Sequence, residues 1–119
     1  MESFYYRLAA NDVERIGDHI SKISLHFTYM SLSGDIRSIL ADLCRECQAI
    51  FMDSSEAFRE SNSDLANDVL GRENSFNEKL INASQLSTED SIEMIIDSFS
   101  RIKDYASNIA ESAIDLSQL

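Results

Sequence analysis

Two carboxylates at helical spacing are the first residues of this sequence that could do chemistry. Glu14 and Asp18 are four positions apart, so on a helix they are neighbours on one strip of surface. Two carboxylates in this arrangement can hold one hard or borderline cation through their oxygen atoms. The same spacing also arises by chance in acidic helices, as Glu60 and Asp64 show in this chain. A solvated face or a protein-docking surface therefore stays open as an alternative to a metal site.

The segment around this pair recurs near the other end of the chain. Residues 14–19 read Glu-Arg-Ile-Gly-Asp-His, and residues 100–105 read Ser-Arg-Ile-Lys-Asp-Tyr. In both copies the isoleucine falls on the apolar seam of an amphipathic helix, and the aspartate two residues later falls on the outward face. We therefore expect any chemistry on the surface of the helices and not in the interior between them.

The second copy is less complete than the first. Asp104 keeps the position of Asp18, but Ser100 stands where the other carboxylate would be. Asn108 and Glu111, one and two turns further along, can contribute oxygen ligands. The second copy therefore predicts a weakened or asymmetric site.

A family resemblance sharpens this interpretation. Glu14-Arg15-Ile16-Gly17-Asp18-His19 and Tyr105-Ala106-Ser107-Asn108-Ile109-Ala110-Glu111 resemble the signature helix of the PhoU family, phosphate-signalling regulators built from repeated helical bundles. Members bind metal ions, in some cases iron clusters, on a surface where Glu or Asp is followed four positions later by Asp. The resemblance implies metal ions here, with iron, zinc or magnesium as the candidates. The expected metal ligands are Glu14, Asp18, Asp104, Asn108 and Glu111.

The resemblance also implies a function. It predicts a cytoplasmic regulator of phosphate uptake or of the phosphate-starvation response, not an enzyme, that docks to the ATPase of a phosphate transporter or to a sensor kinase. We expect Glu14, Asp18 and Asp104 at the docking surface, and we expect a homodimer. Because the family's signature helix closes a three-helix repeat, this chain looks like one complete repeat preceded by the last helix of another. That arrangement resembles the C-terminal part of archaeal phosphate-uptake regulators, whose N-terminal part is an AbrB-like DNA-binding domain.

Two functions from other classes stay open. One is a metal-binding or metal-storing helical bundle without a phosphate role, and the other is a structural dimerisation module. Metal analysis of protein purified without chelator distinguishes them, because a stoichiometric transition metal that is lost on changing Asp18 to Ala favours a metal function.

The remaining reactive residues are better explained by packing. Cys44 and Cys47 form a C-x-x-C pattern, but it lies inside a helical pattern without the βαβ context of a redox motif. His19 and His26 are one heptad apart, about 10 Å along a helix axis, which is too far for one shared ion. The sequence contains no glycine-rich phosphate loop and no Gly-x-Ser-x-Gly elbow.

Composition narrows the class of protein. The chain of 119 residues has 21 acidic and 10 basic residues, a net charge of −11, and a polyanion is repelled by nucleic acid and by anionic membrane surfaces. No segment has the apolar length of a membrane span, and the N-terminus lacks the pattern of a signal peptide. We therefore expect a soluble protein that neither binds nucleic acid through this domain nor inserts into a membrane.

The elements that position these residues are helices. The absence of proline and the heptad-like apolar spacing predict a single all-α domain with helices over about 3–31, 35–61, 64–83 and 88–117. Short connections between them predict an antiparallel up-down four-helix bundle, PhoU-like in its fold. The expected seam of the first helix consists of Ala9, Val13, Ile16, Ile20, Ile23, Phe27 and Met30.

Turn and cap signals set the expected boundaries. Gly34 predicts a left-handed stop after the first helix, and Ser33 or Asp35 an N-cap for the second. The polar residues 61–64 mark the next boundary, and Ser87, with an acidic residue three positions later, predicts an N-cap for the last helix. In the third helix a glutamate interrupts the apolar seam, so this helix is the least regular of the four.

Overall fold

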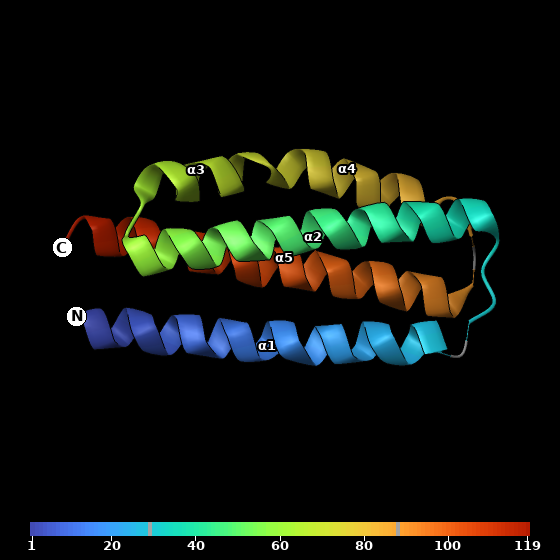
Figure 1. Cartoon of the computed structure of the whole chain (residues 1–119), viewed down its shortest axis with the longest axis horizontal. Helices are drawn as coiled ribbons and strands as arrows, with labels where there is room; N and C mark the ends of the chain where they lie inside the picture. The colour runs from blue at the N-terminus through green and yellow to red at the C-terminus, as the bar shows by residue number, and fades with distance from the viewer. Residues whose placement is uncertain (29, 88) are drawn as a thin grey trace.

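The computed structural model describes residues 1–28, 30–87 and 89–119. Figure 1 shows its helices, which are α1 (Glu2–Thr28), α2 (Gly34–Glu60), α3 (Ser63–Gly71), α4 (Glu73–Ser84) and α5 (Asp90–Ser117). The described residues contain no strand, so the predicted all-α class is confirmed. Tyr29, in the expected first helix, and Thr88, at the expected start of the last, lie outside the described residues.

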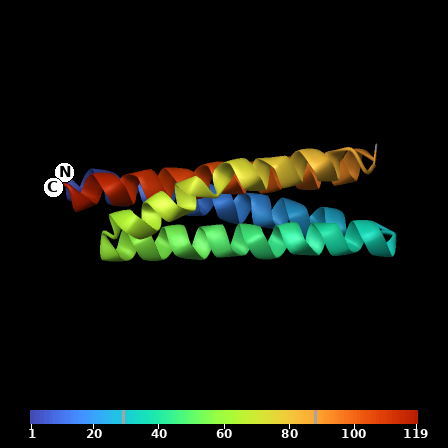
Figure 2. The same cartoon turned by 90° about the horizontal axis from the view of Figure 1, so that it is seen from above.

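The helices share one long axis. The chain extends over 49 × 24 × 16 Å, and its direction reverses from α1 to α2, from α2 to α3 and from α4 to α5 (Figures 1 and 2). Because α3 and α4 follow one another in the same direction, the five helices form four rods. Four rods match the number of helices expected from the sequence.

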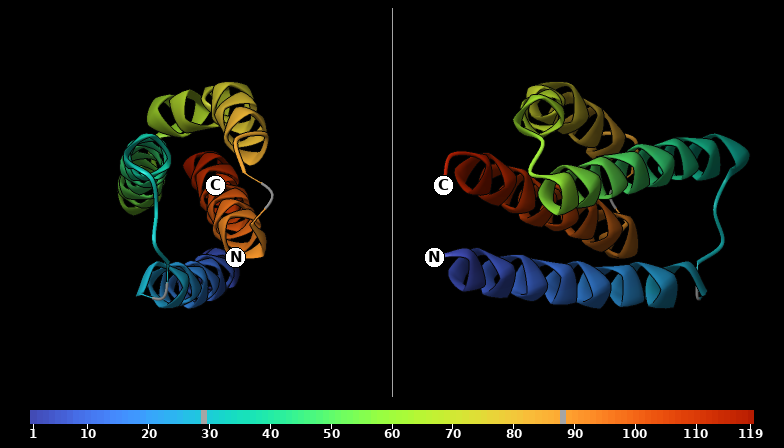
Figure 3. Two further views of the ribbon diagram at one scale, coloured as in Figure 1. Left: turned by 90° about the vertical axis from the view of Figure 1, so that its right-hand side faces the viewer. Right: turned by 60° about the vertical axis from the view of Figure 1, so that its left-hand side comes forward.

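The last helix, α5, is the centre of the molecule. Its backbone lies within 8 Å (Cα–Cα) of every other helix, whereas the described part of α1 comes that close to α5 alone. Seen end-on, α5 lies between α1 on one side and α2, α3 and α4 on the other (Figure 3). The structure is therefore a group formed by α2 to α5, with α1 attached through α5.

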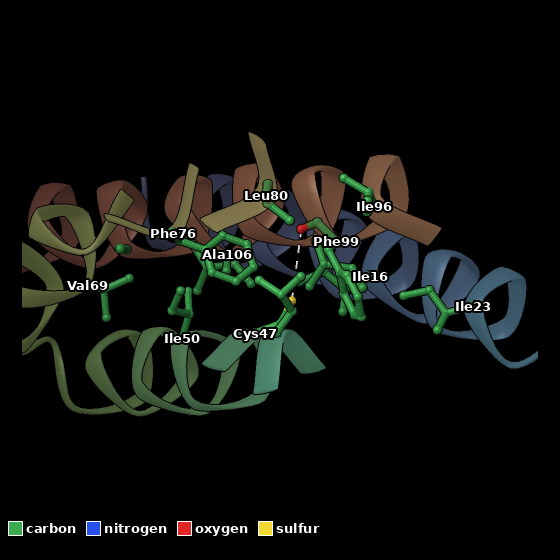
Figure 4. Close-up of a cluster of buried hydrophobic side chains, with 14 of the residues drawn as sticks. Ile16, Ile23, Cys47, Ile50, Val69, Phe76, Leu80, Ile96, Phe99 and Ala106 are labelled. Atoms are coloured by element: carbon green, nitrogen blue, oxygen red, sulfur yellow. Dashed lines mark hydrogen bonds between the residues drawn. The ribbon is translucent and has the colours of Figure 1, made fainter. Parts of the chain in front are cut away.

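The hydrophobic core lies where these helices meet (Figure 4). Phe76 of α4, Phe99 of α5 and Ile50 of α2 are among its largest fully buried side chains, and Ile16 is the equivalent residue from α1. Full burial of an apolar side chain of this size contributes about 1.5–3 kcal/mol. The core is therefore continuous from α4 to α1, and α5 contributes to all of it.

The predicted seam of α1 is only partly buried. Ile16 and Ile23 lie in the core, whereas Val13 and Ile20 are 45% and 49% exposed. Helical spacing places all four on one side of the helix. The backbone of α1 has only one close neighbour, α5, and a single neighbour cannot cover the whole width of that stripe. The expectation that Val13 and Ile20 are core residues is corrected by the structure.

The third expected helix is divided into two. At Arg72 the backbone N–H bonds to the carbonyl oxygen of Val69, three residues back, at 3.1 Å, which tightens the last turn of α3. Gly71 precedes it, and glycine is a poor helix former. The Arg72 side chain then holds the junction, because its guanidinium lies 2.7 Å from Asp53 of α2 and 2.5 Å from Asp68 of α3.

Two of the predicted boundaries are confirmed in detail. Ser33 is the N-cap of α2, where its hydroxyl accepts a bond from the N–H of Ile36 at 3.4 Å. Ser61 ends α2 in the left-handed region, with φ 50° and ψ 44°. Asn62 then caps α3 by accepting from the N–H of Leu65 at 3.1 Å.

Two other boundary predictions are corrected. Gly34 is the first residue of α2, and none of the described glycines has a positive φ, because a serine cap needs no left-handed residue after it. Ser87 accepts a bond from the N–H of Glu89 at 3.1 Å but is not the N-cap of α5, which begins at Asp90 after Glu89.

Candidate functional site

The acidic face, defined as Glu14, Asp18 and Asp104, lies on the surface of α1 and α5, the two helices that carry the repeated segment. All three carboxylates are exposed, the first two on α1 and the third on α5. They point away from the core because Ile16 and Ile102, the apolar residues of the same segments, are buried between the helices. The helices therefore present the acidic signature to solvent.

The two copies of the signature meet in space. His19 and Tyr105, which hold the same place in the two segments, stack with ring centroids 6.1 Å apart. His19 Nδ1 also lies 3.3 Å from the hydroxyl of Ser98 on α5. The α1–α5 contact thus aligns the repeated segments side by side, in opposite directions.

The predicted metal ligands do not form one ligand cluster. The described residues contain no group of three or more His, Cys, Asp or Glu side chains close enough to hold a metal ion. Asp104 already has a cationic partner, because Lys103 Nζ lies 2.6 Å from its carboxylate. Glu14 and Asp18 remain a two-carboxylate pair, which suits Mg²⁺ with several retained waters better than zinc or iron, which prefer sites built from more protein ligands.

Asn108 takes part in a different interaction from the one expected. Its side chain lies near Asp12, a carboxylate of α1 that is buried against α5. Burial raises the pKa of Asp12, and the nearby Asn108 amide opposes that shift. Glu111, the remaining predicted ligand, is exposed on α5. Asn108 therefore belongs to the helix interface.

Sequence reasoning missed this polar edge of the α1–α5 interface. The sequence does contain a pattern that could have predicted it. Asp12 and His19 are one heptad apart on α1, and Ser98 and Tyr105 occupy the matching positions of α5. Burial lowers the pKa of His19, as do the nearby cations Lys22 and Arg101, while the carboxylates of Asp97 and Asp18 oppose that shift. Two titratable side chains, Asp12 and His19, therefore lie at the interface through which α1 packs on α5. The charged set around His19 is Asp18 and Lys22 of α1 and Asp97 and Arg101 of α5.

A groove of about 390 Å³ lies between α1 and α2, and we call it the α1–α2 groove. Ile20 of α1 and Phe51 of α2 line its sides, and Phe99 of α5 lines it from beneath. None of the lining side chains carries a charge. The aromatic rings of Tyr6 and Phe58 meet edge to face at 5.2 Å and join the two helices toward the N-terminus of α1.

The two cysteines differ in reactivity. Cys44 is exposed, whereas Cys47 is buried with its thiol 4.0 Å from the carbonyl oxygen of Phe99. Burial, helped by Cys44 and Glu46, raises the pKa of Cys47 to about 12, so this thiol stays protonated at neutral pH. Cys47 therefore does not supply the activated thiolate that redox C-x-x-C motifs use.

No helix within residues 1–28, 30–87 and 89–119 is long and apolar enough to cross a membrane. The exposed acidic face, the polar helix interface and the uncharged groove are three features of the described part of this chain that could take part in binding. The chain matches no protein-family model, no curated protein and no solved structure.

Proposed function

We propose that this chain is a PhoU-like regulator of phosphate uptake or of phosphate-starvation signalling that acts in the cytoplasm by docking to other proteins through its acidic face. The observation that carries the proposal is the contact between the repeated segments, in which His19 and Tyr105 stack at equivalent positions. The repeated segments lie side by side and their carboxylates are exposed, so a docking partner could contact carboxylates of both α1 and α5.

The grouping of the helices supports the same proposal. The helices from α2 to α5 pack together, and α1 is attached through α5. This is the arrangement implied by one complete three-rod repeat preceded by the last helix of another, within an antiparallel PhoU-like bundle. The proposal therefore rests on helix grouping as well as on the signature segments.

Charge favours a basic partner surface. The net charge is −11, and Glu14 and Asp18 take part in no ion pair among the described residues. Free carboxylates steer association with a positive patch, and this contribution weakens as salt is added. An ATPase subunit of a phosphate transporter or a sensor kinase with a basic docking patch is the proposed partner.

Charge reversal on the acidic face tests the docking proposal. Changing Glu14, Asp18 and Asp104 together to lysine should abolish binding to the purified transporter ATPase or sensor kinase of the source organism, measured by calorimetry. Because all three side chains are exposed, thermal stability should barely change. Undiminished binding would exclude the acidic face as the interface.

A matched control separates the site from the net charge. Glu60, Asp64 and Asp115 are also exposed, and reversing these three charges changes the net charge by the same amount. This control should bind the partner nearly as well as the unmodified chain. If both triple variants lost partner binding to the same extent, binding would depend on the overall charge, and a defined docking face would be refuted.

A metal-binding function is the second candidate. It is favoured by Glu14 and Asp18, which form no ion pair with any other residue that the structure describes. Magnesium at this pair would neutralise two adjacent carboxylates and complete its coordination with water. Titration of magnesium into the chelator-treated protein, followed by calorimetry, should show one weak site that is lost in Asp18→Ala. A transition metal that copurifies in stoichiometric amount would favour metal storage over docking.

A further inference from the structure

One side of α1 has the apolar residue pattern of a packed helix, yet its side chains remain about half exposed to solvent. We define this open stripe as Tyr6, Val13 and Ile20, which are spaced one heptad apart and are about half exposed. The positions that match them in α5 are occupied by Ile92, Phe99 and Ala106, and all three are buried. The side of α5 that its neighbours cover therefore corresponds to a side of α1 that stays half exposed, where among the ring contacts only Tyr6 meets another helix, at Phe58 of α2.

Gly17 lies in the middle of the open stripe. A glycine inside a helix weakens it relative to alanine, and its usual benefit is that another backbone can come close. Apart from its chain neighbours and the backbone of α1 itself, no described atom lies within 4 Å of the position that a Cβ would occupy at Gly17. The described residues therefore supply no close packing partner for this glycine.

We propose that a second copy of this chain covers the open stripe, with the two α1 helices crossing in opposite directions near Gly17. Such a pair places Val13 of one copy beside the partner's Ile20 and reciprocally, because the two residues flank the glycine at similar distances along the helix. Each α1 then also lies along the α1–α2 groove of the other copy.

The available surface is large enough for a stable dimer. A helix of 27 residues is about 40 Å long. Contact along this length, over a strip about 20 Å wide that includes the α1–α2 groove, would cover roughly 800 Å² on each partner. Interfaces of standard size bury about this area per partner.

The chemistry of the groove favours a second copy over a basic peptide. A basic segment would need carboxylates beside it, and the lining of the groove carries no charge. An apolar helix satisfies this lining, and α1 itself presents one. Because each copy carries a charge of −11, added salt should strengthen this association, whereas it should weaken binding of a basic partner.

Sedimentation velocity tests the dimer. We expect the full chain to dimerise with a dissociation constant on the order of 10 μM, and the constant should fall when salt is raised. Ile20→Glu should raise it at least about tenfold, because a charge would be buried at the crossing. Leu25→Glu is the matched control, since Leu25 is 57% exposed on the same helix but does not line the groove, and it should leave the constant unchanged.

Disulfide trapping tests the crossing point in a second way. In a Cys44→Ser background, Gly17→Cys should form a covalent dimer on mild oxidation, because the two positions meet at the crossing, whereas Leu25→Cys should stay monomeric. Circular dichroism verifies that each variant keeps its helices. A monomer at all concentrations, equal weakening by Ile20→Glu and Leu25→Glu, or equal trapping at positions 17 and 25 would each overturn the proposal. The test does not depend on the function of the acidic face.

Discussion

Helices α1 and α5 carry copies of one sequence motif but occupy different surroundings. At equivalent positions Val13 is 45% exposed and Phe99 only 1% exposed, although both belong to the apolar stripe of their helix. Helix α5 has neighbours on several sides, whereas the described part of α1 has a backbone neighbour only in α5. The difference teaches that the motif sets which residues share a face, while the position of the helix decides how much of that face contributes to stability.

The largest expected effect is on the stability of paired core variants. Phe99→Ala should lower the free energy of unfolding by about 3–5 kcal/mol, because it opens a cavity at the centre of the core. Val13→Ala, at the matching position of α1, should lower it by less than about 1 kcal/mol. Urea unfolding of both variants measures the difference, and similar losses would mean that α1 is as well covered as α5.

Hydrogen exchange should reveal a second, smaller difference. Local opening that exposes the amides in the middle of α1 should cost about 2 kcal/mol or more less free energy than opening of α5. The reason is that the backbone of α1 lies close to one helix only, whereas that of α5 lies close to four. Mass spectrometry of peptides covering the two helices measures this at a protein concentration low enough to keep the chain monomeric. Equal protection would contradict the peripheral position of α1.

Gly17→Ala should stabilise the monomer. Alanine is about 0.5–1 kcal/mol better than glycine in a helix interior, and the space at Gly17 is open within the described part of the chain. Thermal unfolding of the dilute variant should therefore show a higher midpoint. A lower midpoint would mean that some group of the same chain does press on Gly17 in solution.

The smallest expected effect is a pH dependence at the α1–α5 interface. Because the folded pKa of His19 is lowered from 6.5, its contribution to stability is complete above pH 6.5 and is lost as the pH falls through the folded pKa. Asp12, with a pKa raised from 3.8, acts in the opposite direction, so its contribution is present at low pH and is lost as the pH rises through its folded pKa.

Urea unfolding between pH 5 and pH 8 tests the contribution of His19. The free energy of unfolding should fall from pH 7 toward pH 5 in the unmodified chain and should fall less in His19→Gln. His26→Gln removes the other histidine of α1 and should keep the slope of the unmodified chain. If the slope survives in His19→Gln, the pH dependence arises elsewhere.

The fold class could be predicted from the sequence because its signals are local. The lack of proline and the heptad spacing specify helices, and Ser33 and Asn62 cap them as their side chains allow. The exposure of Val13 and Ile20 could not be predicted in this way. Periodicity identifies a face of a helix, but the number of helices that cover the face depends on tertiary packing.

The candidate site was predictable only in part. The outward position of Asp18 and Asp104 follows from the two-residue offset to the buried isoleucines. Lys103 pairs with Asp104, and Asn108 lies beside Asp12. Neither contact could be predicted from the sequence, because each depends on the rotamers and neighbours that the packed helices allow. The division of the third helix at Arg72 likewise depends on Asp53, which is distant in the sequence.

The central place of α5 has a consequence for biosynthesis. Every other helix rests on α5, yet its residues 90–117 follow all of the others along the chain. During translation the earlier helices must therefore wait, with their apolar faces open to water, until the segment up to Ser117 has left the ribosome. A stalled or truncated nascent chain would lack the surface on which they assemble, so such chains should depend on chaperones to avoid aggregation.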